Sequence, residues 1–417
     1  MNRREFLYTG TVAAAAAARS MDARAYAAIP GANERVGLGV IGLGRRGTIV
    51  CGGFVQDPRV QIRALADVYD KQAADFQARF KEHVAQAEVS VEYQKMLARK
   101  DVDAVLVSTP DHLHVEIAKD TLGANKHTYL EKPTLHRWSE RGALTKAAEA
   151  SKAILQCGMQ QRSGAHYMRV KQEIFDTGKL GQVIFARAVW SNFSWQRRVI
   201  PNVPKPAGLR WDLFLGPAPK VPFEMSRYSS WRSYHDYGNG LLADILTHWA
   251  DVAQWMLSDD KPETAAALGG DFQLKGDLTN PDTVSAVVRY KNWNLNFESS
   301  VLSIRNPRPS VYFEGTEGTL DLSREGYTLT PNSGAATQFD STQDLERAHT
   351  GNFIDAIVNG TKVNAPLAAG MAASVPVMMA LQSYWSRKLC MAAELSSRLR
   401  MAFGACGNDN LRTRTRE

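Results

Sequence analysis

Three residues of the 417-residue chain carry side chains that together could take a proton from an alcohol: Lys132, Asp244 and His248. Lys132 follows Glu131 at the end of an apolar run, whereas Asp244 and His248 stand four residues apart in a helical segment. A neutral imidazole accepts a proton near neutral pH, and an ammonium group stabilises a developing alkoxide. Because side chains at i and i+4 share a helix face, we expect His248 to be the base, Asp244 to orient it and Lys132 to stabilise the negative charge.

A glycine-rich turn, Gly42-Leu43-Gly44-Arg45-Arg46-Gly47, separates an apolar run from a helical segment. Glycine permits the tight turn and the close approach of a pyrophosphate, and the following helix N-terminus offers free N–H groups. Asp67 stands 20 residues after Gly47, where a carboxylate accepts hydrogen bonds from a ribose diol. That carboxylate would repel a 2′-phosphate, although Arg45 and Arg46 could bind one. The pattern therefore predicts a dinucleotide site that prefers NAD to NADP.

Residues 34–157 alternate short apolar runs with helical segments. Continuously apolar strands separated by helices are typical of a parallel sheet covered on both faces. The expected strands are Val36–Ile41, Ile62–Ala66, Ala104–Ser108, His127–Glu131 and Ile154–Cys157, and the expected helices are Thr48–Phe54, Lys71–Lys81, His112–Gly123 and Ser139–Lys152.

The pattern changes after residue 158, where β-rich runs predominate. Several of these runs alternate polar and apolar residues, which is typical of an antiparallel sheet with one covered face. The expected strands are Val183–Trp195, Thr283–Lys291, Asn292–Leu302 and Ser310–Leu322, and the expected helices are Ala165–Thr177, Asp344–Asn359 and Ala368–Arg398. The Pro- and Trp-rich segment 195–239 is unusually long for a loop, so we expect it to be functional or an interface.

Two motifs follow parallel strands of the first region: Ser108-Thr109-Pro110-Asp111-His112-Leu113-His114 and Glu131-Lys132-Pro133. Ligands of open α/β sheets bind outside the carboxyl ends of the strands, so both motifs lie where a nicotinamide is expected. In this order after the glycine turn, and together with the Asp244–His248 helix, they resemble the glucose–fructose oxidoreductase, inositol dehydrogenase and rhizopine-catabolism (Gfo/Idh/MocA) family. The resemblance extends over about residues 35–398.

The resemblance implies a Rossmann dinucleotide-binding domain at 34–157 and a C-terminal α/β domain at 158–400, with an open, mostly antiparallel sheet that often builds dimers or tetramers. It places Lys132 beside the substrate and the nicotinamide ribose, and it gives Asp244 and His248 a part in proton transfer. The further residues that it places near the cofactor are Thr109, Asp111, His114, Glu131 and Gln160.

Aromatic residues are concentrated in the segment that links the two regions. Aromatic faces stack on pyranose rings and cyclitols, although aromatic side chains are equally common in cores and interfaces. We expect a polyhydroxylated ring as substrate: a sugar, a glycoside or a cyclitol. The candidate substrate-binding residues are Arg162, His166, Tyr167, Trp195 and Tyr237.

Other classes of function are disfavoured. The net charge of +7 is concentrated in residues 1–27 and 387–417, and the nearly neutral remainder argues against nucleic-acid binding. The four cysteines form no C-x-x-C pair, and no spacing puts three metal ligands on one element, so no metal site is expected.

The N-terminal residues 1–27 resemble a twin-arginine (Tat) export signal. Arg3 and Arg4 precede the apolar stretch Leu7–Ala18, and Ala25-Tyr26-Ala27 is typical of a cleavage site. The stretch is shorter than the roughly 20 residues that a membrane span needs. We therefore expect a periplasmic or otherwise exported protein that uses the Tat machinery and has no membrane span once mature. Residues 407–417 are polar and basic, and we expect them to be disordered.

Export creates a difficulty, because free nicotinamide cofactor is scarce outside the cytoplasm. A tightly bound NAD that is recycled within one site would resolve it. The main prediction is an oxidoreductase that transfers hydride from a secondary alcohol of the substrate to the nicotinamide. Some exported relatives are glycoside hydrolases that oxidise a ring carbon transiently and eliminate the aglycone, so a hydrolase is an alternative, although their histidine stands in a different local sequence. A non-catalytic NAD-binding sensor is a second alternative.

Overall fold

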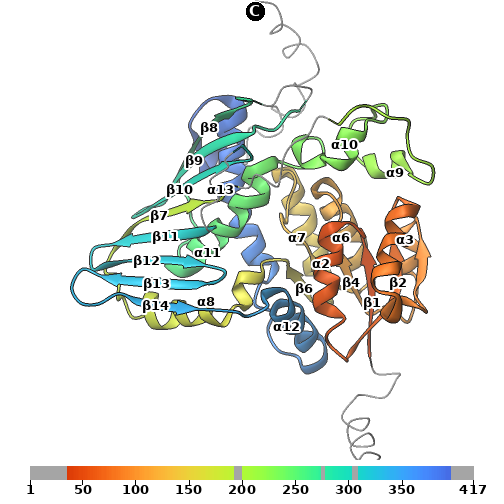
Figure 1. Cartoon of the computed structure of the whole chain (residues 1–417), viewed down its shortest axis with the longest axis horizontal. Helices are drawn as coiled ribbons and strands as arrows, with labels where there is room; N and C mark the ends of the chain where they lie inside the picture. Colours follow the sequence, from red (N-terminus) through yellow and green to blue (C-terminus); the bar gives the residue numbers. More distant parts are fainter. Residues whose placement is uncertain (1–34, 192–199, 274–277, 303–308, 396–417) are drawn as a thin grey trace, which may run out of the picture.

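The computed structural model describes residues 35–191, 200–273, 278–302 and 309–395. The predicted export signal at 1–27, the predicted tail at 407–417 and the substrate candidate Trp195 lie outside the described residues. The described chain forms an N-terminal α/β domain beside a large, mostly antiparallel sheet (Figure 1).

The N-terminal domain contains a six-stranded parallel sheet with the order β3-β2-β1-β4-β5-β6. The strands are β1 Val36–Ile41, β2 Val60–Ala66, β3 Glu88–Ser90, β4 Ala104–Val107, β5 His127–Leu130 and β6 Leu155–Cys157. Every residue of β1 and β4 is buried because helices cover both faces of the sheet. The Rossmann prediction is confirmed, and only the short edge strand β3 was not predicted.

Helices connect the parallel strands. The four predicted helices are present and end within a few residues of the predicted positions, whereas the short helices Lys81–Val84 and Tyr93–Leu97 were not predicted. The α-helices of this domain are α2 Arg45–Phe54, α3 Asp70–Arg79, α4 Lys81–Val84, α5 Tyr93–Leu97, α6 His114–Gly123 and α7 Arg141–Ala150, with 3-10 turns at Asp111–Leu113, Trp138–Glu140 and Gln160–Ser163. Since α2 follows directly on β1, its N-terminus is held at the carboxyl end of the central strand.

The second sheet has nine strands in the order β14-β13-β12-β11-β7-β10-β9-β8-β15. Within the described part of this second sheet, only β7 and β10 pair in parallel. The strands are β7 Val183–Val189, β8 Thr264–Gly270, β9 Thr283–Arg289, β10 Asn294–Ser300, β11 Ser310–Gly315, β12 Gly318–Ser323, β13 Gly326–Pro331, β14 Thr337–Asp340 and β15 Cys390–Met391. The predicted strand Ser310–Leu322 is instead a hairpin of β11 and β12.

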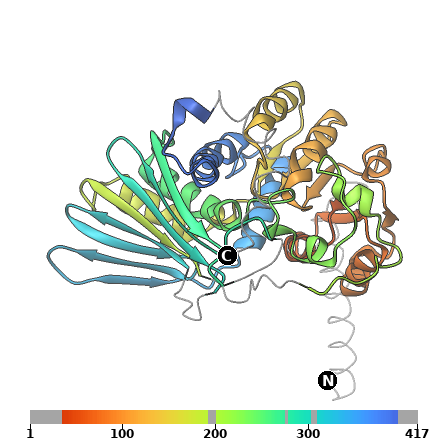
Figure 2. The same ribbon diagram turned by 90° about the horizontal axis from the view of Figure 1, so that it is seen from above.

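Long helices pack against one face of this sheet (Figure 2). They are α8 Ala165–Val170 with a π turn at Lys171–Phe175, α11 Thr247–Leu257 with a π turn at Leu242–Leu246, and α13 Leu367–Ser386. Helix α12 Leu345–Asn359 packs instead against α2 of the N-terminal domain, and its side chains Phe353 and Ile354 belong to the core of that domain. The predicted helix Ala368–Arg398 is too long, because Arg387 adopts a left-handed conformation that ends α13, and β15 then joins the sheet.

Helix α13 joins the two domains, because it contacts both β8 of the large sheet and β6 of the parallel sheet. Among the described helices, it alone is long and apolar enough to cross a membrane by length and composition. Its side chains Ala373, Val377 and Met379 belong to the core, so α13 serves here as a core helix.

The segment between β7 and α11 is only partly irregular. It contains the short helices α9 Trp211–Leu215 and α10 Met225–Ser229 and a 3-10 turn at Trp231–Ser233, and a last 3-10 turn at Ala392–Glu394 follows β15. The aromatic side chains Trp211, Phe214 and Tyr237 form a small separate core. A backbone bridge from Leu209 to Tyr69 attaches this segment to the N-terminal domain, so the segment lies beside the ends of the parallel strands.

Candidate active site

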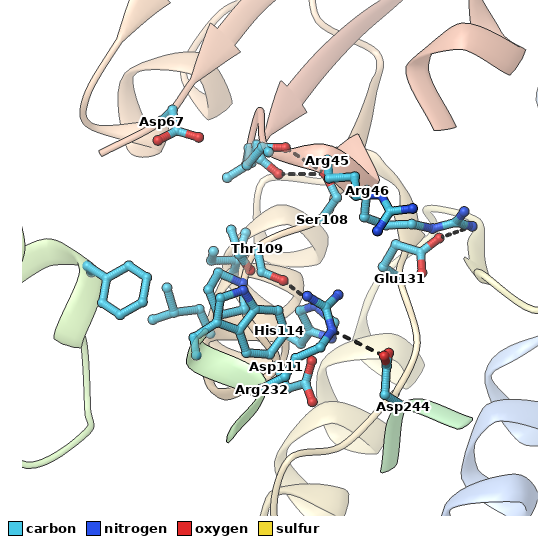
Figure 3. Close-up of a pocket in the computed structure, with 18 of the residues that line it drawn as sticks. Arg45, Arg46, Asp67, Ser108, Thr109, Asp111, His114, Glu131, Arg232 and Asp244 are labelled. Atoms are coloured by element: carbon cyan, nitrogen blue, oxygen red, sulfur yellow. Dashed lines mark hydrogen bonds and ion pairs between the residues drawn. The ribbon is translucent and has the colours of Figure 1, made fainter. Parts of the chain in front are cut away.

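A cavity of about 880 Å³ opens at the carboxyl ends of β1, β2, β4 and β5 and is closed on its other side by residues of the C-terminal domain (Figure 3). The structure therefore brings together side chains that are far apart in the sequence. The predicted residues that line the cavity are Gly42, Gly44, Arg45, Arg46, Asp67, Thr109, Asp111, His114, Glu131, Lys132, Gln160, Asp244 and His248.

The glycine turn has the shape that a pyrophosphate requires. Gly42 has φ +85°, and a Cβ there would lie 2.8 Å from the backbone of Ser108. A Cβ on Gly47 would lie 2.1 Å from the Gly42 oxygen, whereas a Cβ on Gly44 would have no heavy atom within 4 Å. Gly42 and Gly47 thus allow the turn to close, and Gly44 leaves open space before the N-terminus of α2. These residues fit a bound dinucleotide.

Asp67 lies just beyond the end of β2, where the predicted ribose-binding carboxylate belongs. Its two oxygens accept the backbone N–H groups of Leu43, at 2.8 Å, and Tyr69, at 2.9 Å. Burial raises the pKa of Asp67 to about 6 in spite of these hydrogen bonds. The carboxylate is therefore fixed in orientation beside the glycine turn, and each oxygen keeps a second lone pair for a diol.

Arg46 is not free to bind a 2′-phosphate, because two carboxylates hold its guanidinium. The ion-pair distances are 2.8 Å to Glu131 and 2.7 Å to Glu346, and Gln160 donates to Glu346 at 2.9 Å. Burial acts to lower the pKa of Arg46, but the two glutamates raise it overall. Of the two predicted phosphate ligands, only the exposed Arg45 is left without a carboxylate partner in the described part of the chain.

Lys132 and Asp244 meet in the cavity, as predicted. The Lys132 ammonium donates to the Asp244 carboxylate and, at 2.8 Å, to the Asp244 backbone oxygen. Arg232 donates to the other carboxylate oxygen at 3.1 Å (Figure 3). Burial alone would raise the pKa of Asp244, but Lys132 and Arg232 lower it. Asp244 therefore stays ionised and positions the lysine.

His248 lines the same cavity, but the prediction that Asp244 orients it is wrong. Both Asp244 oxygens bind Lys132 and Arg232, and the His248 Nδ1 is buried without a hydrogen-bond partner among the described residues. The i, i+4 argument considered only the helix itself, whereas Lys132 and Arg232 from other segments occupy the Asp244 carboxylate. Burial, then Lys132 and Arg324, lower the pKa of His248 well below its usual value, so the imidazole is neutral.

The loop after β4 contributes two buried titratable groups. Asp111 accepts a hydrogen bond from the backbone of Asn239, and burial, reinforced by Asp244, raises its pKa to about 8. The two ring nitrogens of His114 lie 2.9 Å from the Pro133 oxygen and 3.0 Å from the Thr109 oxygen. Burial lowers the pKa of His114 to about 4, so the neutral ring donates its one N–H to either of these oxygens, depending on the tautomer. His114 thus ties the two strand-end loops together, and Asp111 is protonated at neutral pH.

The predicted substrate residues are mostly elsewhere. Arg162 pairs with Asp251 at 2.8 Å, and His166 is bonded to the Ser323 oxygen at 2.9 Å. Tyr167 and Tyr237 are fully buried in cores. None of these four lines the cavity. A partner or a core already holds each side chain, and the sequence could not show this.

Several cavity residues were not predicted as site residues from the sequence, among them Trp190, Arg232 and Arg324. Trp190 stacks on His248 with the ring centroids 6.1 Å apart. The aromatic stretch contained Trp190, but no pattern distinguished it from its neighbours, and both arginines stand in loops without a motif. Within the described residues, no group of three potential metal ligands was found.

The sequence matches two family descriptions. Residues 36–159 match the oxidoreductase family with an NAD-binding Rossmann fold, and residues 168–321 match the GFO/IDH/MocA C-terminal domain. Similar curated proteins include an uncharacterised oxidoreductase, YrbE of Bacillus subtilis, at 23% identity over 75% of this chain and 78% of the relative. Inositol 2-dehydrogenase of Salmonella typhimurium is 27% identical over 60% of this chain and 61% of its own length, which is less than two thirds.

Among solved structures, levoglucosan dehydrogenase in complex with NADH and levoglucosan resembles this structure with a TM-score of 0.69 at 18% sequence identity. The match covers 86% of this chain and 99% of that one. This likeness supports the fold. The glycine turn, the carboxylate after β2 and the two matched domains lead to one conclusion: the chain belongs to the Gfo/Idh/MocA family of oxidoreductases, with NAD as its cofactor.

Proposed function

We propose that the protein is a dehydrogenase that oxidises a secondary alcohol of a sugar, glycoside or cyclitol. The observation that carries the proposal is the convergence of Lys132 and His248, 116 residues apart in the sequence, on the cavity that the glycine turn borders. The names of the relatives, which include inositol and levoglucosan dehydrogenases, support a polyhydroxylated substrate.

The cavity residues divide the work of alcohol oxidation. Bound NAD supplies the hydride acceptor. The Lys132 ammonium, held by Asp244, stabilises the negative charge that develops on the substrate oxygen. The neutral imidazole of His248 accepts the hydroxyl proton. Because Lys132 and Arg324 disfavour the imidazolium form, His248 must pass this proton on before the next turnover.

The test is a screen of sugars, cyclitols and nitrophenyl glycosides with the purified protein. NAD reduction that depends on one of these compounds, without release of nitrophenol, is the expected result. Nitrophenol release without net NAD reduction would instead identify a hydrolase. Bound NAD with neither reaction would identify a sensor. Denaturing the protein and measuring released NAD(H) tests whether the cofactor is tightly bound.

Residue-specific variants test the assignment of roles. Lys132→Ala and His248→Ala should each reduce turnover strongly and leave NAD bound, because neither side chain belongs to the glycine turn. Unchanged turnover in both variants would refute the site. Arg289→Gln, on an exposed side chain of β9 paired with Glu263, is the matched control and should leave turnover unchanged.

We also propose export through the Tat machinery and assembly into a homo-oligomer. The twin arginines at Arg3 and Arg4 support export, and detection of the mature protein in a periplasmic fraction tests it. Leu268 and Val287 are exposed apolar residues on the adjacent strands β8 and β9, which supports association through the large sheet. Light scattering should then give a dimer or tetramer that Val287→Lys disrupts.

A further inference from the structure

Arg324 is a partly buried cation of the cavity. It stands in the turn between β12 and β13 and lines the cavity with Trp190 and His248. Among the neighbouring cations, Arg46 binds Glu131 and Glu346, and Lys132 and Arg232 share the carboxylate of Asp244. Within the described part of the chain, no ion pair involves Arg324, and its Nε is buried without a hydrogen-bond partner.

The surroundings of Arg324 make this charge costly. Burial lowers the pKa of Arg324 and Arg46 adds to this effect, whereas Tyr167, Glu346 and Glu325 act against it. The guanidinium carbon of Arg324 lies 5.1 Å from the centroid of the Trp190 ring. A cation withdrawn from water without a paired anion is unfavourable, so an anionic ligand would complete the site.

The ligand must enter from the main cavity. Arg324 also borders a smaller cavity of about 340 Å³. However, Trp190, against which the guanidinium lies, lines only the main cavity, and Arg324 is close enough to His248 to lower the pKa of that imidazole. An anion on Arg324 would therefore lie next to the proposed base, so it belongs to the substrate.

The geometry of the guanidinium indicates the chemical class of this anion. A guanidinium forms two parallel hydrogen bonds with a carboxylate, and a sugar acid carries this group on the same molecule as the polyhydroxylated chain or ring. A phosphate ester binds a guanidinium in a similar way, and the experiment below compares the two. Resting on the proposed dehydrogenase function, we propose that the substrate is a sugar acid whose carboxylate binds Arg324 while its ring lies on Trp190.

The test measures binding to the protein loaded with NADH, so that no turnover is needed. Calorimetry should compare glucuronate, galacturonate and gluconate with glucose, galactose and glucitol. At least one acid should bind the wild type at least about tenfold more tightly than its neutral counterpart. Arg324→Gln should weaken the binding of this acid by about 10- to 100-fold, as expected for a charged hydrogen bond, and should leave the binding of the neutral compound unchanged. Arg324→Lys should lose part of the affinity.

Two controls make the result specific. NADH affinity should stay the same in both Arg324 variants, which shows that they are folded, and Arg289→Gln should bind like the wild type. Acids that bind no better than neutral compounds would overturn the inference, as would equal losses of acid and NADH affinity in Arg324→Gln. Tighter binding of glucose 6-phosphate than of glucuronate would also overturn it, in favour of a phosphate ester.

The inference and the proposed function can fail separately. Acid binding that depends on Arg324, in a protein that reduces no NAD with any compound, would reject the dehydrogenase and keep the anion site. NAD reduction by neutral sugars alone, with no effect of Arg324→Gln, would keep the dehydrogenase and reject the anion site.

Discussion

The contributions of the two buried aspartates of the cavity, Asp111 and Asp244, to folding stability should depend on pH in different ways. Burial, reinforced by Asp244, raises the pKa of Asp111 from an ordinary 3.8 to about 8. For an acid whose folded pKa is raised, the unfolded state loses its proton first, so folding stability falls as pH increases from the unfolded pKa to the folded one. Asp111→Asn removes this ionisation and keeps the shape of the side chain. The variant should therefore gain stability over the wild type as pH increases.

The expected size follows from the same two pKa values. Each pH unit between them changes the free energy of unfolding by about 1.4 kcal/mol. Between pH 5 and pH 8, the wild type should thus lose up to about 4 kcal/mol relative to Asp111→Asn. Urea denaturation of both proteins without cofactor, at pH 5, 6, 7 and 8, measures this difference. Most of the change should be complete at pH 8.

Asp244→Asn is the matched control, because Asp244 is equally buried in the same cavity. Lys132 and Arg232 lower the pKa of Asp244 against the effect of burial, so its stabilising contribution is lost only as pH falls below the ordinary value. From pH 5 to pH 8, the difference between wild type and Asp244→Asn should therefore be constant. A pH-independent difference for Asp111→Asn as well would mean that Asp111 is ionised, and the reasoning from burial would be refuted.

Three further substitutions test the cofactor and alcohol sites. Lys132→Ala should lower kcat by about 10²- to 10³-fold with little change in the dissociation constant of NAD, as measured by initial rates and calorimetry. Asp67→Asn should weaken NAD binding by about 10- to 100-fold in a fluorescence titration. A loss of folding stability as large as the loss of binding free energy would contradict the role of Asp67 in binding the ribose. Gly44→Ala should weaken NAD without destabilising the protein, because its Cβ meets no protein atom within 4 Å. Gly47→Ala should in addition destabilise the protein by about 1–3 kcal/mol, since the new Cβ would lie 2.1 Å from the Gly42 oxygen. Equal melting temperatures for the Gly44→Ala and Gly47→Ala variants would reject this difference in stability.

The cofactor half of the site was predictable because its determinants are local. Continuous apolar runs define β1 and β4, and the glycines of the turn have conformations or close contacts that exclude other residues. Asp67 follows the next strand at a fixed spacing. Each feature needs only its own short segment and the general rule that parallel strands end at one edge of the sheet.

The substrate half could not be predicted in the same way, because its side chains depend on distant partners. Arg162 looked available for a ligand, but Asp251 on α11 neutralises it. No residue pattern shows that Lys132 and Arg232 occupy the Asp244 carboxylate and leave His248 without it. Arg324 stands in a turn of the large sheet, and only the packing of that sheet against the parallel domain brings it to Trp190.

The charges of the cavity connect the proposed chemistry to its architecture. Asp244 keeps Lys132 in place, and the positive charge of Lys132 is in turn one reason why His248 is neutral. The same ammonium can therefore stabilise the substrate oxygen and keep the imidazole ready to accept the proton. The positive charge of Arg324 also disfavours the imidazolium form of His248, and an anion bound to Arg324 would offset this charge. Substrate binding would then make His248 a stronger base, so that proton acceptance is favoured only when the substrate is in place.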